Sequence, residues 1–223
     1  MKLLLPKETI FVFDLDDTLF YEIDYLKSAY QEIAETLKPQ NSFELYDIML
    51  QKYNLGENVF EFLLNEYREI VVDIEDLLNL YRNHIPNITL KEEVKDLLNE
   101  LIKNKIKIGL ITDGRSITQR NKLKSLEIEN YFNDIIISEE FGTSKPNELN
   151  YKYFMDKYPN NKYIYLGDNP KKDFVTANKL DWLTICLLDE GKNIHKQKFD
   201  IEKEYLPILT ITSFKELEII YEH

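Results

Sequence analysis

The chain has 223 residues, a length that suits one α/β domain or a core domain with a modest insertion. Its formal net charge of −12 argues against a nucleic-acid partner, because non-specific phosphate-backbone binding needs a basic surface. The single cysteine, Cys186, excludes an intramolecular disulfide framework and suits a reducing compartment. No segment has the roughly 18 apolar residues that a membrane span requires. We therefore predict a cytoplasmic protein without a membrane partner.

The first part of the chain changes from a strand to a series of helices. Residues 10–13 (Ile-Phe-Val-Phe) predict a strand that is buried on both faces of a parallel sheet. Helical patterns follow, interrupted by Pro39 and Gly56. These helices are predicted over residues 26–37, 43–53, 58–69 and 74–82. An all-helical segment, 21–86, is therefore expected to be inserted directly after the first strand.

From residue 90 onward, helices and strands alternate. The predicted helices cover residues 90–103, 116–126, 147–157 and 171–180, and the predicted strands cover 106–111, 134–138, 163–166 and 183–188. The tail, 208–222, predicts a short strand and then a helix capped by Ser213. This alternation is typical of an α/β fold with a parallel sheet and helices on both faces. The core is predicted to comprise residues 1–20 and 87–223.

Polar residues follow four of the predicted strands. They are Asp14-Leu15-Asp16-Asp17-Thr18, then Thr112-Asp113-Gly114, then Ser144-Lys145-Pro146, and finally Gly167-Asp168 through to Asp173. In an open parallel sheet, ligands bind outside the carboxyl ends of the strands. We therefore expect these acids, the hydroxyl and the ammonium group to converge on one site.

Phosphoryl transfer through an aspartyl intermediate suits this set of residues. Asp14 is the predicted nucleophile. Because a carboxylate and a phosphate repel each other, a cation must lie between them, and hard oxygen ligands favour Mg²⁺. Asp14 and Asp168 are predicted to supply carboxylate oxygens to the metal, and Asp16 its backbone carbonyl.

The remaining polar residues have predicted supporting roles. Asp16 can protonate the leaving oxygen and later deprotonate the attacking water. Thr112 can donate a hydrogen bond to a phosphoryl oxygen, and Lys145 can offset charge on the phosphoryl group and the nucleophile. Asp173 can orient Lys145 or a metal-bound water, or cap the following helix.

Two further positions have more than one interpretation. Thr18 can contact phosphate or fix the turn after the nucleophile. Asp113, which precedes Gly114, can bind a hydroxyl or amine of the substrate, or be a turn residue that points outward.

The four ordered motifs resemble those of the haloacid dehalogenase superfamily. The resemblance rests on Asp14-Leu15-Asp16-Asp17-Thr18-Leu19, on Thr112, on Lys145-Pro146, and on Gly167-Asp168 through to Asp173. It implies a Rossmann-like core, a helical cap of the C1 type over residues 21–86, and Mg²⁺-dependent hydrolysis of a small phosphorylated metabolite. Many members have Asn where this chain has Asp113.

Three alternatives remain open at this point. A phosphomutase would use the same aspartyl phosphate but return it to a sugar. A dehalogenase would need no metal, but such relatives lack an acid at the position of Asp16. A phospho-accepting or ligand-binding regulator would also carry acids, Thr and Lys at strand ends. Such receivers are shorter, however, and a helical insertion after the first acid does not fit them.

Overall fold

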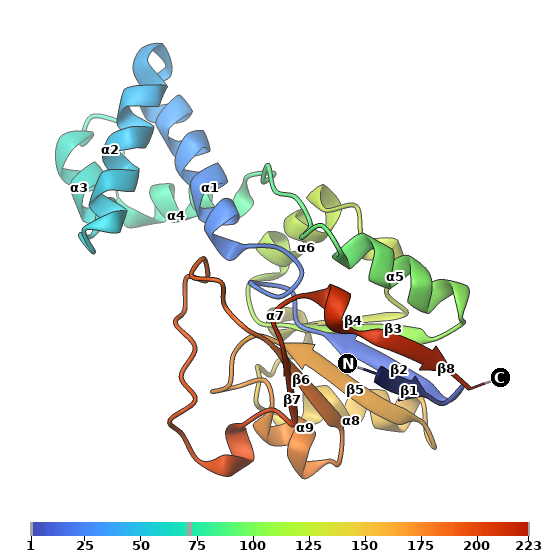
Figure 1. The fold of residues 1–223 in the computed structure, drawn as a ribbon. Helices are drawn as coiled ribbons and strands as arrows, with labels where there is room; N and C mark the ends of the chain where they lie inside the picture. The colour runs from blue at the N-terminus through green and yellow to red at the C-terminus, as the bar shows by residue number, and fades with distance from the viewer. Residues whose placement is uncertain (1, 71–72, 223) are drawn as a thin grey trace.

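The largest sheet of the protein has six parallel strands. The computed structural model describes residues 2–70 and 73–222, and its main sheet has the strand order β4-β3-β2-β5-β6-β7 (Figure 1). The strands are β2 (Thr9–Phe13), β3 (Lys107–Thr112), β4 (Asp134–Ile137), β5 (Lys162–Gly167), β6 (Leu183–Leu187) and β7 (Leu209–Ile211). The chain runs from β2 to β3 and β4, and then crosses to β5 on the other side of β2. The order therefore reverses at β2, the position where ligands collect in such sheets.

Helices cover both faces of this sheet. In Figure 1, α5 (Val94–Lys103) and α6 (Ser116–Ser125) lie on one side, and α8 (Glu148–Lys157) and α9 (Val175–Lys179) lie on the other. Strand β2 explains the two-sided core, because all of its residues are buried. Phe11 and Phe13 belong to the same core cluster as Leu98 of α5, whereas Val12 belongs to the cluster of Phe154 of α8. The predicted α/β fold is confirmed.

The helices after β2 form a cluster with its own apolar core. They are α1 (Glu22–Leu37), α2 (Ser42–Asn54), α3 (Val59–Glu66) and α4 (Ile74–Asn83), and we call residues 22–83 the helical insertion. Buried side chains such as Ile33, Leu45 and Leu63 pack against one another there. The insertion lies beyond the carboxyl ends of the strands (Figure 1). Helix α3 ends at Glu66, earlier than predicted, and residues 71–72 of the following connection lie outside the described residues.

The structure corrects the prediction for the tail. Ser213 caps only the short 3₁₀ turn η4 (Phe214–Glu216), and the chain then continues as strand β8 (Glu218–Tyr221) instead of a helix. Strand β8 pairs in parallel with β1 (Lys2–Leu5), so the two ends of the chain form a separate small sheet (Figure 1). Leu3 and Leu5 are buried against the core. A partner strand from the opposite end of the sequence therefore overrides the local helical pattern.

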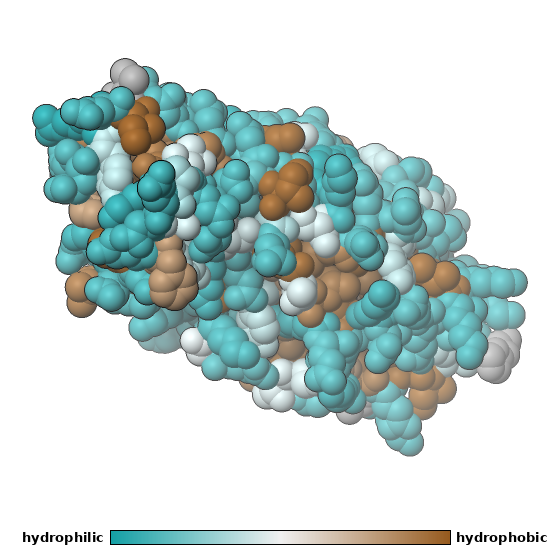
Figure 2. All heavy atoms as spheres, turned by 90° about the horizontal axis from the view of Figure 1, so that it is seen from above, coloured by the Kyte–Doolittle hydropathy of each residue, from teal (hydrophilic) through white to brown (hydrophobic). Residues whose placement is uncertain are grey.

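Other connections and the surface complete the fold. Helix α9 begins at Val175, later than predicted, since the preceding residues form the turn that carries Asp173. The short elements are α7 (Ser138–Phe141), η1 (Pro39–Asn41), η2 (Glu129–Tyr131) and η3 (Lys203–Tyr205). The face seen in Figure 2 is mostly hydrophilic, with separate apolar groups. Among the described residues, no helix combines the length and the apolar character that crossing a membrane demands.

Candidate active site

Three neighbouring strands bring the predicted site residues together. Asp14 directly follows β2, Thr112 is the last residue of β3, and Asp168 directly follows β5. Strand β2 pairs with both β3 and β5, so these residues lie side by side at the carboxyl edge of the sheet. The backbone N–H of Asp14 donates to Leu166 O at 2.9 Å, which continues the strand pairing up to the site. The topology of the sheet therefore places the site.

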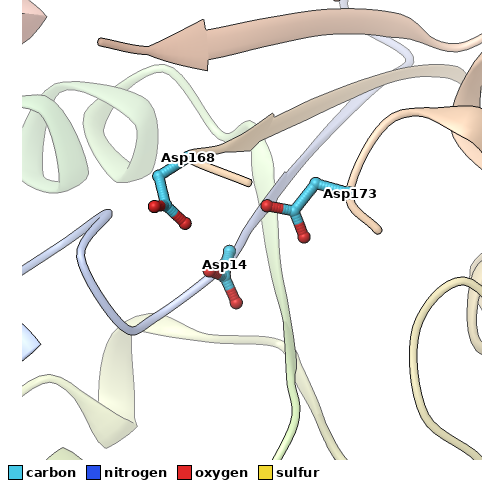
Figure 3. Close-up of side chains that lie close together, drawn as sticks. All are labelled: Asp14, Asp168 and Asp173. Atoms are coloured by element: carbon cyan, nitrogen blue, oxygen red, sulfur yellow. The ribbon is translucent and has the colours of Figure 1, made fainter. Parts of the chain in front are cut away.

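A cluster of three buried carboxylates forms the centre of this edge. Carboxylate oxygens of Asp14, Asp168 and Asp173 lie within 4.8 Å of one another, and the side chains converge in Figure 3. Two like charges about 4 Å apart repel by roughly 4 kcal/mol at an effective dielectric constant of 20. Burial, supported by Asp173 and opposed by Lys145, raises the pKa of Asp14 to about 7. Burial and the neighbouring carboxylates also raise the pKa of Asp168.

One buried ammonium group partly balances these acids. Lys145 Nζ lies 2.5 Å from Asp14 Oδ1 and 2.8 Å from Asp173 Oδ1, and its side chain is 0% exposed. Burial opposes the charge, but Asp14 and Asp173 outweigh it and raise the pKa of Lys145. Three carboxyl groups share one ammonium group, so ionising all three would leave an excess of negative charge in a buried site. Carboxylate oxygens are the preferred ligands of Mg²⁺, so this donor set fits a divalent cation.

Asp16 and Thr112 are connected through residues of helix α6. Asp16 Oδ1 lies 2.7 Å from Lys122 Nζ, and Asp16 Oδ2 accepts a hydrogen bond from Gln119 Nε2 at 2.9 Å. Gln119 Nε2 also donates to Thr112 Oγ1 at 2.5 Å. Sequence reasoning missed Gln119 and Lys122. The signal that could have found them is helical spacing, since they share the inner face of α6 with Leu123, where apolar residues are expected.

Thr18 and Asp113 both hold residues of the site in place. Thr18 Oγ1 donates to Asp14 Oδ2 at 3.4 Å from a buried position, which agrees with the turn-fixing interpretation. Asp113 does not point outward. Its Oδ1 accepts a hydrogen bond from the backbone N–H of Lys145 at 3.0 Å, and its Oδ2 lies 3.4 Å from Lys172 Nζ. Gly114 N donates to Ser138 Oγ at 2.9 Å, and so links the end of β3 to α7.

Comparison with known protein families identifies the chain. The haloacid dehalogenase-like hydrolase family matches residues 11–186, a range that includes the acids described above, Lys145 and most of the main sheet. The chain belongs to the haloacid dehalogenase-like hydrolases. The predicted family is confirmed.

Individual relatives of this hydrolase are similar over most of its length. A glyceraldehyde 3-phosphate phosphatase of Methanocaldococcus jannaschii is 29% identical over 223 residues, covering 92% of this chain and 93% of the relative. The pyrimidine 5'-nucleotidase YjjG of Escherichia coli is 31% identical over 55% of this chain and 52% of its own length. The magnesium-bound crystal structure of the putative HAD-hydrolase YfnB from Bacillus subtilis shares the fold, with a TM-score of 0.65, 19% identity and coverage of 93% and 96%.

A tight approach at one glycine positions Asp173 in this haloacid dehalogenase-like hydrolase. A Cβ atom on Gly167 would lie 2.6 Å from Asp173 Oδ2, closer than real Cβ contacts allow. The same carboxylate oxygen accepts the backbone N–H of Asn169 at 2.7 Å. Asp173 therefore folds back over the end of β5, and glycine is needed there so that its carboxylate can reach Lys145.

The first helix of the insertion places another acid near the site. Glu22 begins α1, and its backbone N–H donates to Asp17 Oδ1 at 2.9 Å. Burial raises the pKa of Glu22 to about 8. The nearby carboxylates of Asp16 and Asp17 act in the same direction, and the positive charge of Lys122 opposes them. Asp17 is buried, and by accepting the hydrogen bond from Glu22 it caps the start of α1.

The 189–197 loop connects Asp168 with the insertion. Asn193 Nδ2 donates to Asp168 Oδ2 at 2.8 Å, and Gln197 Nε2 donates to Asp168 O at 2.6 Å. Between them, Ile194 packs against the apolar core of the insertion. Residues of α1, α2 and this loop also line a shared pocket of about 680 Å³. No helix or strand was predicted for this polar segment, whose hydrogen-bond partner Asp168 is distant in the chain.

Proposed function

We propose that this protein is a Mg²⁺-dependent phosphatase that hydrolyses a small phosphate monoester through an aspartyl phosphate on Asp14. The observation that carries the proposal is the buried contact between Asp14 and Lys145, at 2.5 Å, beside Asp168. It combines a nucleophilic oxygen, a fixed positive charge and acidic metal ligands in one place. The relatives named as a glyceraldehyde 3-phosphate phosphatase and a pyrimidine 5'-nucleotidase agree with this activity.

Asp14 and Asp168 would hold the metal, with Asp173 beside them. The backbone carbonyl of Asp16 is a further proposed ligand. Bound Mg²⁺ supplies the positive charge that lets a carboxylate approach a phosphate dianion. The excess of carboxylate over ammonium in this buried cluster supports the proposal.

The residues of the chain divide the reaction into two steps. In the first, Asp14 attacks phosphorus, the bond from phosphorus to the leaving oxygen breaks, and Asp16 gives that oxygen a proton. In the second, water attacks the same phosphorus, Asp16 takes the proton from the water, and the bond to Asp14 breaks. Throughout, Thr112 donates to a phosphoryl oxygen and Lys145 offsets its charge.

The helical insertion is proposed to act as the cap of this site. We assign residues 21–86 to the cap and residues 1–20 and 87–223 to the catalytic core. Two contacts support this proposal: the backbone N–H of Glu22 donates to Asp17 Oδ1 beside the site, and Ile194 packs against the apolar core of the insertion. A cap in this position would exclude water from the first step and contact the part of the substrate that differs between phosphate monoesters.

The relatives suggest which substrates to test first. The relative named glyceraldehyde 3-phosphate phosphatase aligns with nearly the whole chain, so small sugar phosphates of this kind are the first candidates. The partial match to a pyrimidine 5'-nucleotidase makes nucleoside monophosphates the second. The cytoplasmic location stays a prediction that rests on the single, buried Cys186.

A panel of phosphate monoesters with Mg²⁺ tests the proposal. We expect release of inorganic phosphate from at least one sugar phosphate or nucleotide. Asp14→Asn should lose at least about 10³-fold in turnover while it stays folded, the scale found when acting catalytic groups are removed. Asp96→Asn, a change of the same kind at an exposed position of α5, should retain full activity.

The outcomes separate the rival functions. An isomeric sugar phosphate in place of inorganic phosphate would mean a phosphomutase. Activity that survives EDTA would revive a metal-free dehalogenase. Incorporation of phosphate without turnover would favour the regulator.

A further inference from the structure

A second buried lysine lies next to the proposed acid–base residue. The side chain of Lys122 is 4% exposed, and its Nζ lies 2.7 Å from Asp16 Oδ1. The ammonium also lies 4.4 Å from the centre of the Tyr25 ring of the insertion. Burying an ammonium group is costly unless it is paired, so Asp16 and the ring together explain why Lys122 is tolerated there. Asp16 is therefore already paired with Lys122 before a substrate binds between the insertion and the core.

The amide of Gln119, one turn earlier on α6, holds the other oxygen of Asp16. Gln119 Nε2 lies 2.9 Å from Asp16 Oδ2 and 3.1 Å from Asp113 O. A carbonyl oxygen only accepts, and a carboxylate does as well, so the amide nitrogen must face these two groups. Both oxygens of Asp16 are thus held from a single helix.

The same amide fixes the direction of the Thr112 hydroxyl. Gln119 Nε2 also donates to Thr112 Oγ1 at 2.5 Å, so its two hydrogens are shared among three acceptors and the hydroxyl oxygen accepts in this contact. The hydroxyl hydrogen is then left for another acceptor, and a phosphoryl oxygen is the acceptor that the proposed reaction supplies. Gln119 therefore couples the phosphate-binding hydroxyl to the acid–base carboxyl.

We infer that Lys122 and Gln119 are positioning residues for proton transfer by Asp16. This inference rests on the proposed phosphatase function. In the first step, the O–P bond of the leaving group breaks and the proton moves from Asp16 to the leaving oxygen, so that a carboxylate remains. Lys122 stabilises that carboxylate, and Gln119 keeps it directed at the phosphoryl group, ready to accept a proton from water in the second step.

A comparison of two leaving groups tests this role. An alkyl phosphate needs a proton on its departing oxygen, whereas the nitrophenolate of p-nitrophenyl phosphate departs without one. The value of kcat/KM covers only the steps up to the aspartyl phosphate. Lys122→Met should therefore lower kcat/KM for the alkyl phosphate by about 10²-fold, the lower end of general acid catalysis, and for p-nitrophenyl phosphate by less than about fivefold. Because the second step still needs Asp16 as a base, p-nitrophenyl phosphate should also show a burst of nitrophenol.

Matched variants complete the experiment. Lys122→Arg keeps the charge and should recover most of the lost activity with the alkyl phosphate. Lys124→Met, at an exposed position of the same helix, should behave as wild type with both substrates. If Lys122→Met does not fold, Lys122→Gln permits the same comparison with a polar side chain. Circular dichroism shows which variants are folded.

Each result has one meaning. Equal losses with both substrates, or no loss with either, would overturn the positioning role while leaving the phosphatase proposal intact. The alkyl phosphate is the sugar phosphate or nucleotide of the panel that wild type hydrolyses fastest. A wild-type protein that releases phosphate from no member of the panel would overturn the phosphatase proposal, and with it this inference.

Discussion

The carboxyl edge of the sheet and the helical insertion differ in how their side chains are placed. At the sheet edge, Asp14 and Asp168 each follow a strand directly, so backbone pairing decides where they lie. In the insertion, buried residues such as Leu45 and Met49 are apolar and pack against one another. Periodicity reveals such helices but not what they contact outside their own core. The reaction is therefore readable from the sequence, while the choice of substrate is not.

After Asp14→Asn, the largest effect is expected from removing the buried cation at the sheet edge. Lys145→Met leaves Asp14 and Asp173 without their ammonium partner. Turnover should fall about 10²–10³-fold, as for the loss of one group that stabilises transition-state charge. Metal-free stability should fall by about 3 kcal/mol, since breaking a buried ion pair leaves uncompensated charge. Steady-state kinetics and urea unfolding measure the two effects.

The control for this variant is Lys152→Met on α8. Lys152 is an exposed residue whose ammonium lies 2.9 Å from Glu148, four residues earlier. Such surface pairs contribute at most about 0.5 kcal/mol, so this variant should remain active and nearly as stable as wild type. A Lys145→Met protein with wild-type turnover would show that the sheet edge is not the reaction centre.

Two glycine-to-alanine changes compare the regions directly. Gly167→Ala forces a methyl group against Asp173 and should lower turnover by about tenfold, which corresponds to a loss of about 1.4 kcal/mol in transition-state stabilisation. Gly56→Ala in the insertion meets nothing within 4 Å, but it lies at a φ of +74°. It should cost about 1 kcal/mol in stability and leave turnover unchanged. Steady-state kinetics and thermal unfolding measure the two effects. Unchanged turnover in Gly167→Ala together with lower turnover in Gly56→Ala would contradict the assignment of the active site to the sheet edge.

The last prediction concerns pH and the Asp14 carboxyl, and it affects stability and not turnover. Its pKa is about 7 in the folded protein against an ordinary value of 3.8, so the folded state holds a proton that the unfolded chain has already released. Metal-free stability should therefore fall as the pH rises from about 4 to about 7. Asp14→Asn removes this titration. Its Tm advantage over wild type should grow by roughly 5–10 °C between about pH 5 and about pH 8 in EDTA.

The same Tm measurement can be repeated with added magnesium. At about pH 8, where Asp14 is ionised, added Mg²⁺ should raise the Tm of the wild type more than that of Asp14→Asn. A Tm difference that stays constant with pH in EDTA would mean that Asp14 does not titrate in this range.

Most of the core fold follows from local sequence, and its main failure has a physical reason. Apolar runs such as residues 10–13 mark strands because both faces of the sheet are covered. The tail was predicted to be a helix because Ser213 and the residues after it carry a helical start signal. That prediction is wrong, since the pairing partner of β8 is β1, at the other end of the chain. Local patterns contain no information about such distant pairing.

The site shows the same division between local and distant information. Asp14 and Asp168 were found because each directly follows a strand, and Lys145 because its Ser-Lys-Pro motif comes a few residues after β4. The structure brings the three together. Gln119 and Lys122 were missed because they lie in the middle of a helix. Their role is seen only in the folded structure, where these two side chains of α6 contact Asp16 at the sheet edge.

The 189–197 loop has a mechanical consequence for the catalytic cycle. Its Ile194 packs against the helices of the insertion, while Asn193, the residue before it, donates a hydrogen bond to the carboxylate of Asp168. Swinging the insertion outward to admit substrate or free phosphate would pull on that carboxylate through a single peptide unit. In the proposed enzyme, movement of the insertion and the position of the Asp168 carboxylate would thus be linked through these two neighbouring residues.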